Sequence, residues 1–320
     1  MGNSNPILTI GIPTWNRQLE LEQCLELVLR QVAAEEGVEV MVCDNASDDG
    51  TRAVVEELMR THRVLRYERH ATNIGADRNF IEVLRRAAGT YVWILSDDDF
   101  VNEGAIRRIL QIIRTYSPSY ISLNYVYCDD RQQRIITQPD QRYMLKRDVA
   151  HADINRSFLL RSHWLSFLSC SIYRRDLVDF DDLAANRDKV PNWIQVYMTA
   201  QVLAKGQDGY HAGFDGVLAR FGNDRVTSTP FVDYMPEAFM HIFRKFNVDK
   251  KVVDAVIRGI RETFLSFPCF LAYRARGQSP SPLIVPAYFK IGLLFPRPFL
   301  IGIRKIYRLL KSRNRVEQPG

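Results

Sequence analysis

The stretch ILTIGIPTWNRQLELEQCLELVLRQVAAEEGVEVMVC, residues 7–43, decides the fold because its hydrophobic period changes twice. The apolar run 7–12 predicts a buried strand, and the run 38–43 predicts a second one. Between them, apolar residues recur at helical spacing, namely Leu21, Leu25, Val28 and Val32. A strand, a helix and a strand in this order predict a βαβ unit with two parallel strands.

The same alternation continues as far as residue 127. It predicts helices over 51–60, 77–88 and 103–116 and strands over 64–67, 91–95 and 120–127. The later sequence is less regular and predicts a strand over 166–173 and helices over 194–204 and 235–275. We therefore expect an α/β protein with a mostly parallel sheet flanked by helices, followed by a helical C-terminal extension. Ligands of such sheets bind in the crevice at the carboxyl ends of the strands.

The composition is that of a globular protein, with 46% hydrophobic and 25% charged residues, which excludes disordered and low-complexity classes. The net charge of +6 comes from the C-terminal tail, because residues 286–320 hold eight basic side chains and one acidic one. The rest of the chain is close to neutral, which argues against a nucleic-acid partner.

The cysteine and histidine patterns argue against a disulfide framework and a zinc site. The five cysteines are odd in number and none lies at metal-ligand spacing from another, and no two histidines are four residues apart. The chain does not start with a signal-peptide pattern, and no run of about 18 apolar residues occurs. We expect a cytoplasmic protein in a reducing compartment.

Three consecutive carboxylates, Asp97, Asp98 and Asp99, follow the predicted strand 91–95. Such carboxylates repel one another and raise one another's pKa unless a cation neutralises them. Mg²⁺ or Mn²⁺ suits this task, because hard cations prefer oxygen ligands and share them with substrate phosphates. An isolated Asp triplet is more often a solvated turn that caps the next helix, but its place at the end of a buried strand favours the metal.

Asp44 follows the second predicted strand, and two interpretations of it remain open. It can accept hydrogen bonds from a ribose or base, or it can form a turn with its neighbours Asn45, Ser47 and Asp48. No Gly-x-Gly-x-x-Gly follows the first strand and no Walker A sequence occurs, which argues against nicotinamide redox chemistry and P-loop chemistry.

Five motifs now stand in order along the chain: Pro13-Thr14-x-Asn16-Arg17, Asp44-Asn45-x-Ser47-x-Asp49-Gly50-Thr51, Asn73-x-Gly75, Arg78-Asn79 and the acidic triplet. Their order and spacing resemble a family 2 glycosyltransferase of the GT-A fold over about residues 5–130. The resemblance implies a Rossmann-like GT-A sheet. It also implies transfer of a sugar from a nucleotide diphosphate to a hydroxyl acceptor, usually with inversion.

The resemblance also implies roles for single residues. Pro13, Thr14 and Arg17 are expected to line the nucleotide-sugar pocket. Asp44 is expected to contact the base or ribose, and Arg78 the region of the diphosphate. Asp97 and Asp98 are expected to contact the donor. The triplet resembles the DxD motif that holds the metal. Asp97 and Asp99 form that motif directly, whereas the family's usual Leu-Asp-x-Asp-Asp aligns with Asp98 and Asp99 as the retained pair.

The expected catalytic base departs from the family pattern. Many relatives carry a Glu-Asp pair at the start of a helix in the acceptor half, but here residues 188–193 read Asp-Lys-Val-Pro-Asn-Trp. Asp188 is the nearest carboxylate. It is a candidate general base for the acceptor hydroxyl, or else a solvated loop residue.

Prolines interrupt the sequence after residue 278, where short apolar clusters alternate with Lys and Arg. This pattern is typical of a basic amphipathic tail that lies on an anionic membrane surface, although core helices with a solvated basic end would also produce it. The predicted organisation is a nucleotide-sugar-binding half over 1–127 and an acceptor-binding half of the same domain over 128–230. A helical extension over 231–277 and the tail over 278–320 follow.

Together with the resemblance, these features predict a metal-dependent glycosyltransferase on the inner face of the cell membrane, with Mg²⁺ or Mn²⁺ as cofactor. The resemblance and the tail imply that it moves a hexosyl or deoxyhexosyl group to a lipid-linked oligosaccharide or another cell-envelope glycan. A nucleotidyltransferase is an alternative, but it would usually carry a Gly-rich phosphate loop where residues 13–17 stand. A membrane-attached scaffold with a decayed catalytic site is the non-enzymatic alternative, motivated by the missing Glu-Asp pair.

Overall fold

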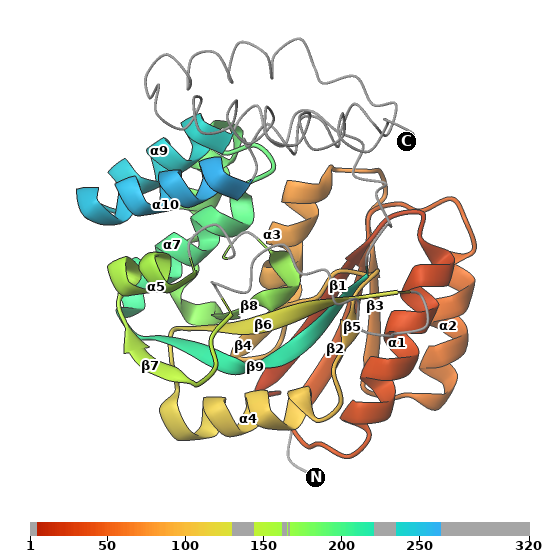
Figure 1. Ribbon diagram of the computed structural model, residues 1–320. Coiled ribbons are helices and arrows are strands. Elements are labelled where there is room, and N and C mark those ends of the chain that lie inside the picture. Colours follow the sequence, from red (N-terminus) through yellow and green to blue (C-terminus); the bar gives the residue numbers. More distant parts are fainter. Residues whose placement is uncertain (1–4, 130–143, 162–164, 166, 221–234, 264–320) are drawn as a thin grey trace, which may run out of the picture.

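The first four parallel strands confirm the predicted βαβ series. The computed structural model describes residues 5–129, 144–161, 165, 167–220 and 235–263 (Figure 1). One half of its sheet has the order β3-β2-β1-β4, all parallel, which we call the first half of the sheet. Its strands are β1 (Leu8–Thr14), β2 (Val38–Asp44), β3 (Leu65–Arg69) and β4 (Tyr91–Ile94), and its connecting helices are α1 (Gln18–Val32), α2 (Thr51–Thr61) and α3 (Ala76–Arg86).

The second half of the sheet is mixed rather than parallel, and it completes nine strands among the described residues. Its strands are β5 (Phe100–Val101), β6 (Tyr120–Cys128), β7 (Val149–Ala152), β8 (Ser171–Arg174) and β9 (Gly209–Arg220). β8 runs antiparallel to β4 and β6, whereas β6 and β9 are parallel. The predicted strand 166–173 begins only at Ser171, because Leu168–Cys170 form the 3₁₀ helix η3.

Of the two later helices predicted from the sequence, the structure confirms the one over 194–204 as α7 and divides the one over 235–275. They are α4 (Ala105–Tyr116), α5 (Ile154–Arg161), α6 (Phe180–Asn186), α7 (Ile194–Gly206), α9 (Met235–Lys245) and α10 (Lys250–Thr263), with 3₁₀ helices η4 (Arg175–Leu177) and η5 (Arg187–Lys189). The predicted helix 235–275 is broken after Lys245, where Asn247 has a φ of 51°. The tail 278–320 lies outside the described residues. Within those that are described, no helix has the length and apolar character needed to cross a membrane.

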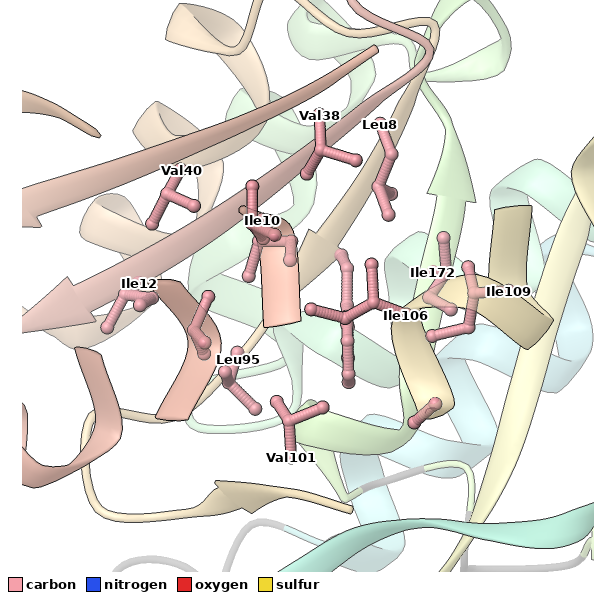
Figure 2. Close-up of a cluster of buried hydrophobic side chains, with 14 of the residues drawn as sticks. Leu8, Ile10, Ile12, Val38, Val40, Leu95, Val101, Ile106, Ile109 and Ile172 are labelled. Atoms are coloured by element: carbon pink, nitrogen blue, oxygen red, sulfur yellow. The ribbon is translucent and has the colours of Figure 1, made fainter. Parts of the chain in front are cut away.

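Two buried clusters lie on opposite faces of the sheet and hold its helices. On one face, Leu8, Ile10 and Ile12 alternate along β1 and belong to a cluster that includes residues of α1, α2 and α4 (Figure 2). On the other face, α3 and α7 pack with Met41, Val92 and Ile94. α3 lies so close to β1 that a Cβ added to Gly11 would come within 2.2 Å of Val83 Cγ1. Because β1, β2 and β4 are parallel, their carboxyl ends lie at the same edge of the sheet.

Candidate active site

The carboxyl ends of β1 and β4 bring together four of the predicted site residues. Thr14 Oγ1 donates a hydrogen bond to Asp97 Oδ2 at 2.7 Å. Arg17 Nη1 donates to Asp97 Oδ1 at 3.0 Å and also to Asp98. The first and fifth motifs of the sequence therefore meet in space, because β1 and β4 are neighbours in the sheet.

The third carboxylate of the triplet has partners from the second half of the sheet. Ser169 Oγ donates a hydrogen bond to Asp99 Oδ2 at 2.5 Å and accepts one from the backbone N–H of Ser96. The backbone N–H of Arg220, at the end of β9, donates to Asp99 Oδ1 at 3.3 Å. The sequence interpretation did not assign Ser169 to the site. Only the pairing of β8 with β4 places it there.

Burial and mutual repulsion raise the pKa values of two of these carboxyl groups. Burial raises the pKa of Asp97 to about 7, with Asp98 adding to the shift and Arg17 opposing it. Burial, followed by the charge of Asp98, raises the pKa of Asp99 to about 8. Burial lowers the pKa of Arg17, but the charges of Asp97 and Asp98 outweigh it, so the net shift is upward. One guanidinium thus contacts two of three adjacent carboxyl groups, and the raised pKa values mean that a further cation is needed before all three are ionised near neutral pH.

The triplet offers part of a metal site rather than a complete one. In the described part of the chain, no group of three His, Cys, Asp or Glu side chains is arranged to hold a metal ion. Mg²⁺, however, usually takes only one or two protein carboxylates and completes its shell with water and substrate phosphates. The side chain of Asp98 is 17% exposed, against 6% for Asp97. The carboxyl oxygens, whose raised pKa values a cation would lower, therefore fit a divalent cation that is shared with a diphosphate.

Asp44 lies at the end of β2, and its carboxylate is fully used by the protein. Ser47 donates to Asp44 Oδ1 from both its backbone N–H and its hydroxyl. Tyr67 Oη and Arg69 Nε donate to Asp44 Oδ2. The residue has no exposed surface. In this structure Asp44 thus forms the turn that was one of the two interpretations of the sequence.

The third motif fixes the start of α3. Asn45 Nδ2 donates to Asn73 Oδ1 at 2.9 Å, and the backbone N–H of Ile74 donates to Asn45 Oδ1 at 2.8 Å. Gly75 then has a φ of 85°, a conformation that favours glycine. α3 begins directly after Gly75, and Arg78 is exposed in its first turn. Pro13, the other predicted residue of the pocket, is buried within β1.

Asp188 is solvent-exposed in the 3₁₀ helix η5, ahead of α7. Its side chain is 84% exposed and accepts hydrogen bonds from Arg187. Nearby, Asp77 in the first turn of α3 accepts a hydrogen bond from the backbone N–H of Asn192 at 2.9 Å, and burial raises its pKa. This contact, which the sequence did not predict, ties the start of α3 to the segment that leads into α7.

Comparisons with known proteins agree with this architecture. The chain is 28% identical over 192 residues to the abequosyltransferase RfbV of Salmonella typhimurium, covering 55% of this chain and 56% of that protein. It is 31% identical over 107 residues to the GalNAc(5)-diNAcBac-PP-undecaprenol beta-1,3-glucosyltransferase of Campylobacter jejuni, covering 33% of this chain and 34% of that protein. The matches thus span about half and a third of these relatives.

Solved structures show the same fold at low sequence identity. The structure of Staphylococcus aureus TarS 1–349 in complex with UDP-GlcNAc matches with a TM-score of 0.60 and 18% identity, over 88% of this chain and 79% of that one. The mannosyltransferase PcManGT from Pyrobaculum calidifontis, in complex with GDP-Man and Mn²⁺, matches with a TM-score of 0.54 and 15% identity, over 98% of this chain and 88% of that one. The model of the family "Glycosyl transferase family 2" matches residues 9–179, more than half of the chain. With its mixed sheet and the five motifs at one edge, the chain belongs to glycosyl transferase family 2 and has the GT-A fold.

Proposed function

We propose that the protein transfers a sugar from a nucleoside diphosphate donor to a hydroxyl group of a lipid-linked oligosaccharide or another cell-envelope glycan. The observation that carries this proposal is the junction of Thr14, Arg17 and the triplet at the carboxyl ends of β1 and β4. The acceptor class is supported by the Campylobacter relative, whose name specifies an undecaprenol-linked substrate.

Cleavage of the bond between sugar and phosphate leaves negative charge on the diphosphate. Arg17 is held at the site by Asp97 and Asp98, so its guanidinium is oriented before the donor arrives. Mg²⁺ or Mn²⁺, held by Asp99 together with Asp97 or Asp98, would supply the further positive charge that the leaving group requires. Arg78, exposed at the start of α3, is the residue we assign to the outer part of the diphosphate.

The acceptor hydroxyl must lose a proton as it attacks the anomeric carbon. We assign this task to Asp188, whose solvent-exposed carboxylate lies just before α7. A base on the face opposite the leaving group would give inversion, and we propose that outcome. We also propose a hexosyl or deoxyhexosyl donor.

We propose that the basic tail, residues 278–320, attaches the protein to the inner face of the cell membrane. This assignment rests on the sequence pattern of apolar clusters and cations. Attachment there would bring the protein to the membrane that holds a lipid-linked acceptor.

Hydrolysis of nucleotide sugars by the purified full chain tests the proposal. With Mn²⁺ present, we expect slow release of a nucleoside diphosphate from at least one donor in a panel of UDP-, GDP-, CDP-, ADP- and dTDP-sugars. EDTA should stop this release. Formation of pyrophosphate from a nucleoside triphosphate and a sugar phosphate would instead indicate a nucleotidyltransferase. Absence of both reactions, together with absence of nucleotide binding, would indicate a scaffold.

A further inference from the structure

The last residue of β3 presents part of its guanidinium group to solvent. Arg69 is the cross-strand partner of Asp44 in the parallel pair β2–β3. Arg69 Nε donates to Asp44 Oδ2 at 3.1 Å, and Arg69 Nη2 donates to the carbonyl oxygen of Ser47 at 2.6 Å. The guanidinium has five N–H groups in one plane. These two bonds use one edge of it, so among the described residues the edge formed by Nη1 and Nη2 keeps N–H groups without an acceptor.

The surroundings hold this guanidinium in place. Asp44 is fully buried and also accepts hydrogen bonds from Tyr67 and Ser47. The side chain of Arg69 is 37% exposed, so its outer edge can reach a ligand while its inner edge stays bound. A ligand that arrives at the ends of β2 and β3 therefore meets the donors of Arg69 rather than the oxygens of Asp44.

The position of Arg69 matches one part of the proposed donor. β1 lies between β2 and β4, and neighbouring strands are about 4.8 Å apart, so the end of β2 lies about 10 Å from the end of β4. If the diphosphate binds at the triplet, as the proposed function requires, the nucleoside extends along the edge toward β2 and β3. Its base then comes to the outer edge of Arg69.

We propose that Arg69 selects the nucleobase of the donor, and that Asp44 positions Arg69 rather than binding the base. Two parallel N–H groups suit a base with two adjacent acceptors, which are O2 and N3 in cytosine and O6 and N7 in guanine. In uracil the N3–H group separates O2 from O4, and in adenine N7 lies beside an amino donor. This inference rests on the proposed function and adds the class of donor base to it.

Equilibrium binding of CDP, GDP, UDP and ADP to the full chain, with Mg²⁺ present, tests the selection. We expect CDP or GDP to bind roughly 10- to 100-fold more tightly than UDP and ADP, the range that one bidentate contact between Arg and a base provides. Arg69→Lys keeps the charge beside Asp44 but lacks the fork, and Arg69→Gln removes both. Both variants should lose the preference for CDP or GDP.

Arg66→Gln is the matched control, because Arg66 lies in the same strand but bonds to Glu39 and Glu68. Its preference among the four nucleotides should equal that of the wild type. Tighter binding of UDP or ADP by the wild type, or a preference that persists in Arg69→Lys, would overturn the role of Arg69 while leaving the transferase proposal intact. Failure of these four nucleotides and of dTDP to bind would overturn the proposed function itself.

Discussion

The two halves of the sheet differ in where their buried polar side chains lie. At the carboxyl edge of the first half, the carboxyl groups of Asp97 and Asp98 contact the guanidinium of Arg17, and Asp99 is buried beside them. In the second half, the polar side chains lie inside the fold. Arg161 is 1% exposed and donates to Asn124 Oδ1 at 2.6 Å and to Ser122 Oγ at 3.0 Å.

A buried histidine extends this internal network. His211 Nδ1 lies 2.7 Å from Ser122 Oγ, and His211 Nε2 lies 2.8 Å from Ser157 Oγ. Burial lowers the pKa of His211 to about 3 and that of Arg161 to about 10. The network connects β6, β9 and α5, so it stabilises the sheet, whereas two carboxyl groups of the triplet have raised pKa values that a bound cation would lower. The comparison teaches that two polar clusters can both be hydrogen-bonded and still differ in use, because one lies inside the fold and the other lies at the carboxyl edge, where a ligand can bind.

The largest effect that we predict concerns the triplet. Asp99→Asn should lower the rate of sugar transfer by about 10⁴-fold, about 5 kcal/mol of transition-state stabilisation, because it removes one ligand of the metal. The measurement is steady-state transfer with saturating Mn²⁺, and circular dichroism should show an unchanged fold. Asp48→Asn, at an exposed site in the loop after β2, is the control. A nearly normal rate in Asp99→Asn would contradict a catalytic role for the triplet, and with it the difference between the two halves.

The second prediction concerns Asp188, in the segment before α7. Asp188→Asn should lower kcat by roughly 10²–10⁴-fold, the usual contribution of a general base, with donor affinity nearly unchanged. Asp181→Asn changes another exposed carboxylate and should leave kcat as it is. If kcat of Asp188→Asn equals that of the wild type, Asp188 is a solvated residue and another group takes the proton.

The third prediction concerns the internal network. Arg161→Met should lower the free energy of unfolding by about 3 kcal/mol, because Asn124 and Ser122 lose a donor and each unsatisfied group costs about 1–3 kcal/mol. Urea denaturation measures this loss. Arg156→Met, at an exposed position of the same helix, should change stability by no more than about 0.5 kcal/mol. Equal stability of the two variants would contradict a structural role for the network.

Acid should weaken the second half through His211. Its pKa is about 3 in the folded protein and about 6.5 in an unfolded chain, so the unfolded state binds the proton first as the pH falls. Stability should therefore be fully present above pH 6.5 and decline between pH 6.5 and pH 3. The loss from this group is about 2 kcal/mol between pH 7 and pH 5.

Urea denaturation at several pH values measures this slope. His211→Gln should flatten it, while His62→Gln, in which a partly exposed histidine is changed, should keep it. A slope that is the same in the wild type and in His211→Gln would show that other groups govern acid stability.

The smallest effect per residue that we predict concerns the basic side chains of the tail, which belongs to neither half of the sheet. Replacement of Arg304, Lys305, Arg308 and Lys311 by Gln should weaken binding to anionic vesicles by about 1 kcal/mol per charge. Salt should screen this contribution, whereas binding through the apolar clusters should persist. Co-sedimentation with anionic and neutral vesicles measures both parts. If the wild-type chain and a chain that lacks residues 281–320 both stay in the supernatant, the tail does not attach the protein to a membrane.

The sequence predicts the first half of the sheet well because its signals are local. Each strand there is a short apolar run and each helix has its own apolar stripe, so the element type follows from spacing alone. The second half is harder to predict. β9 contains Gly209, Gly213 and Gly216, which weaken the strand signal, and β5 has only two residues.

By itself, then, the sequence determined the βαβ series and the family, and it predicted which motifs form the site. The tertiary structure decided which of those residues meet. Ser169 reaches Asp99 across 70 positions of the chain, and Asp77 contacts Asn192 across 115. It also decided that Asp44 is buried and fully bonded while Asp188 is exposed. Spacing along a chain predicts the period of an element, but burial and partners depend on strand pairing between segments that are distant in sequence.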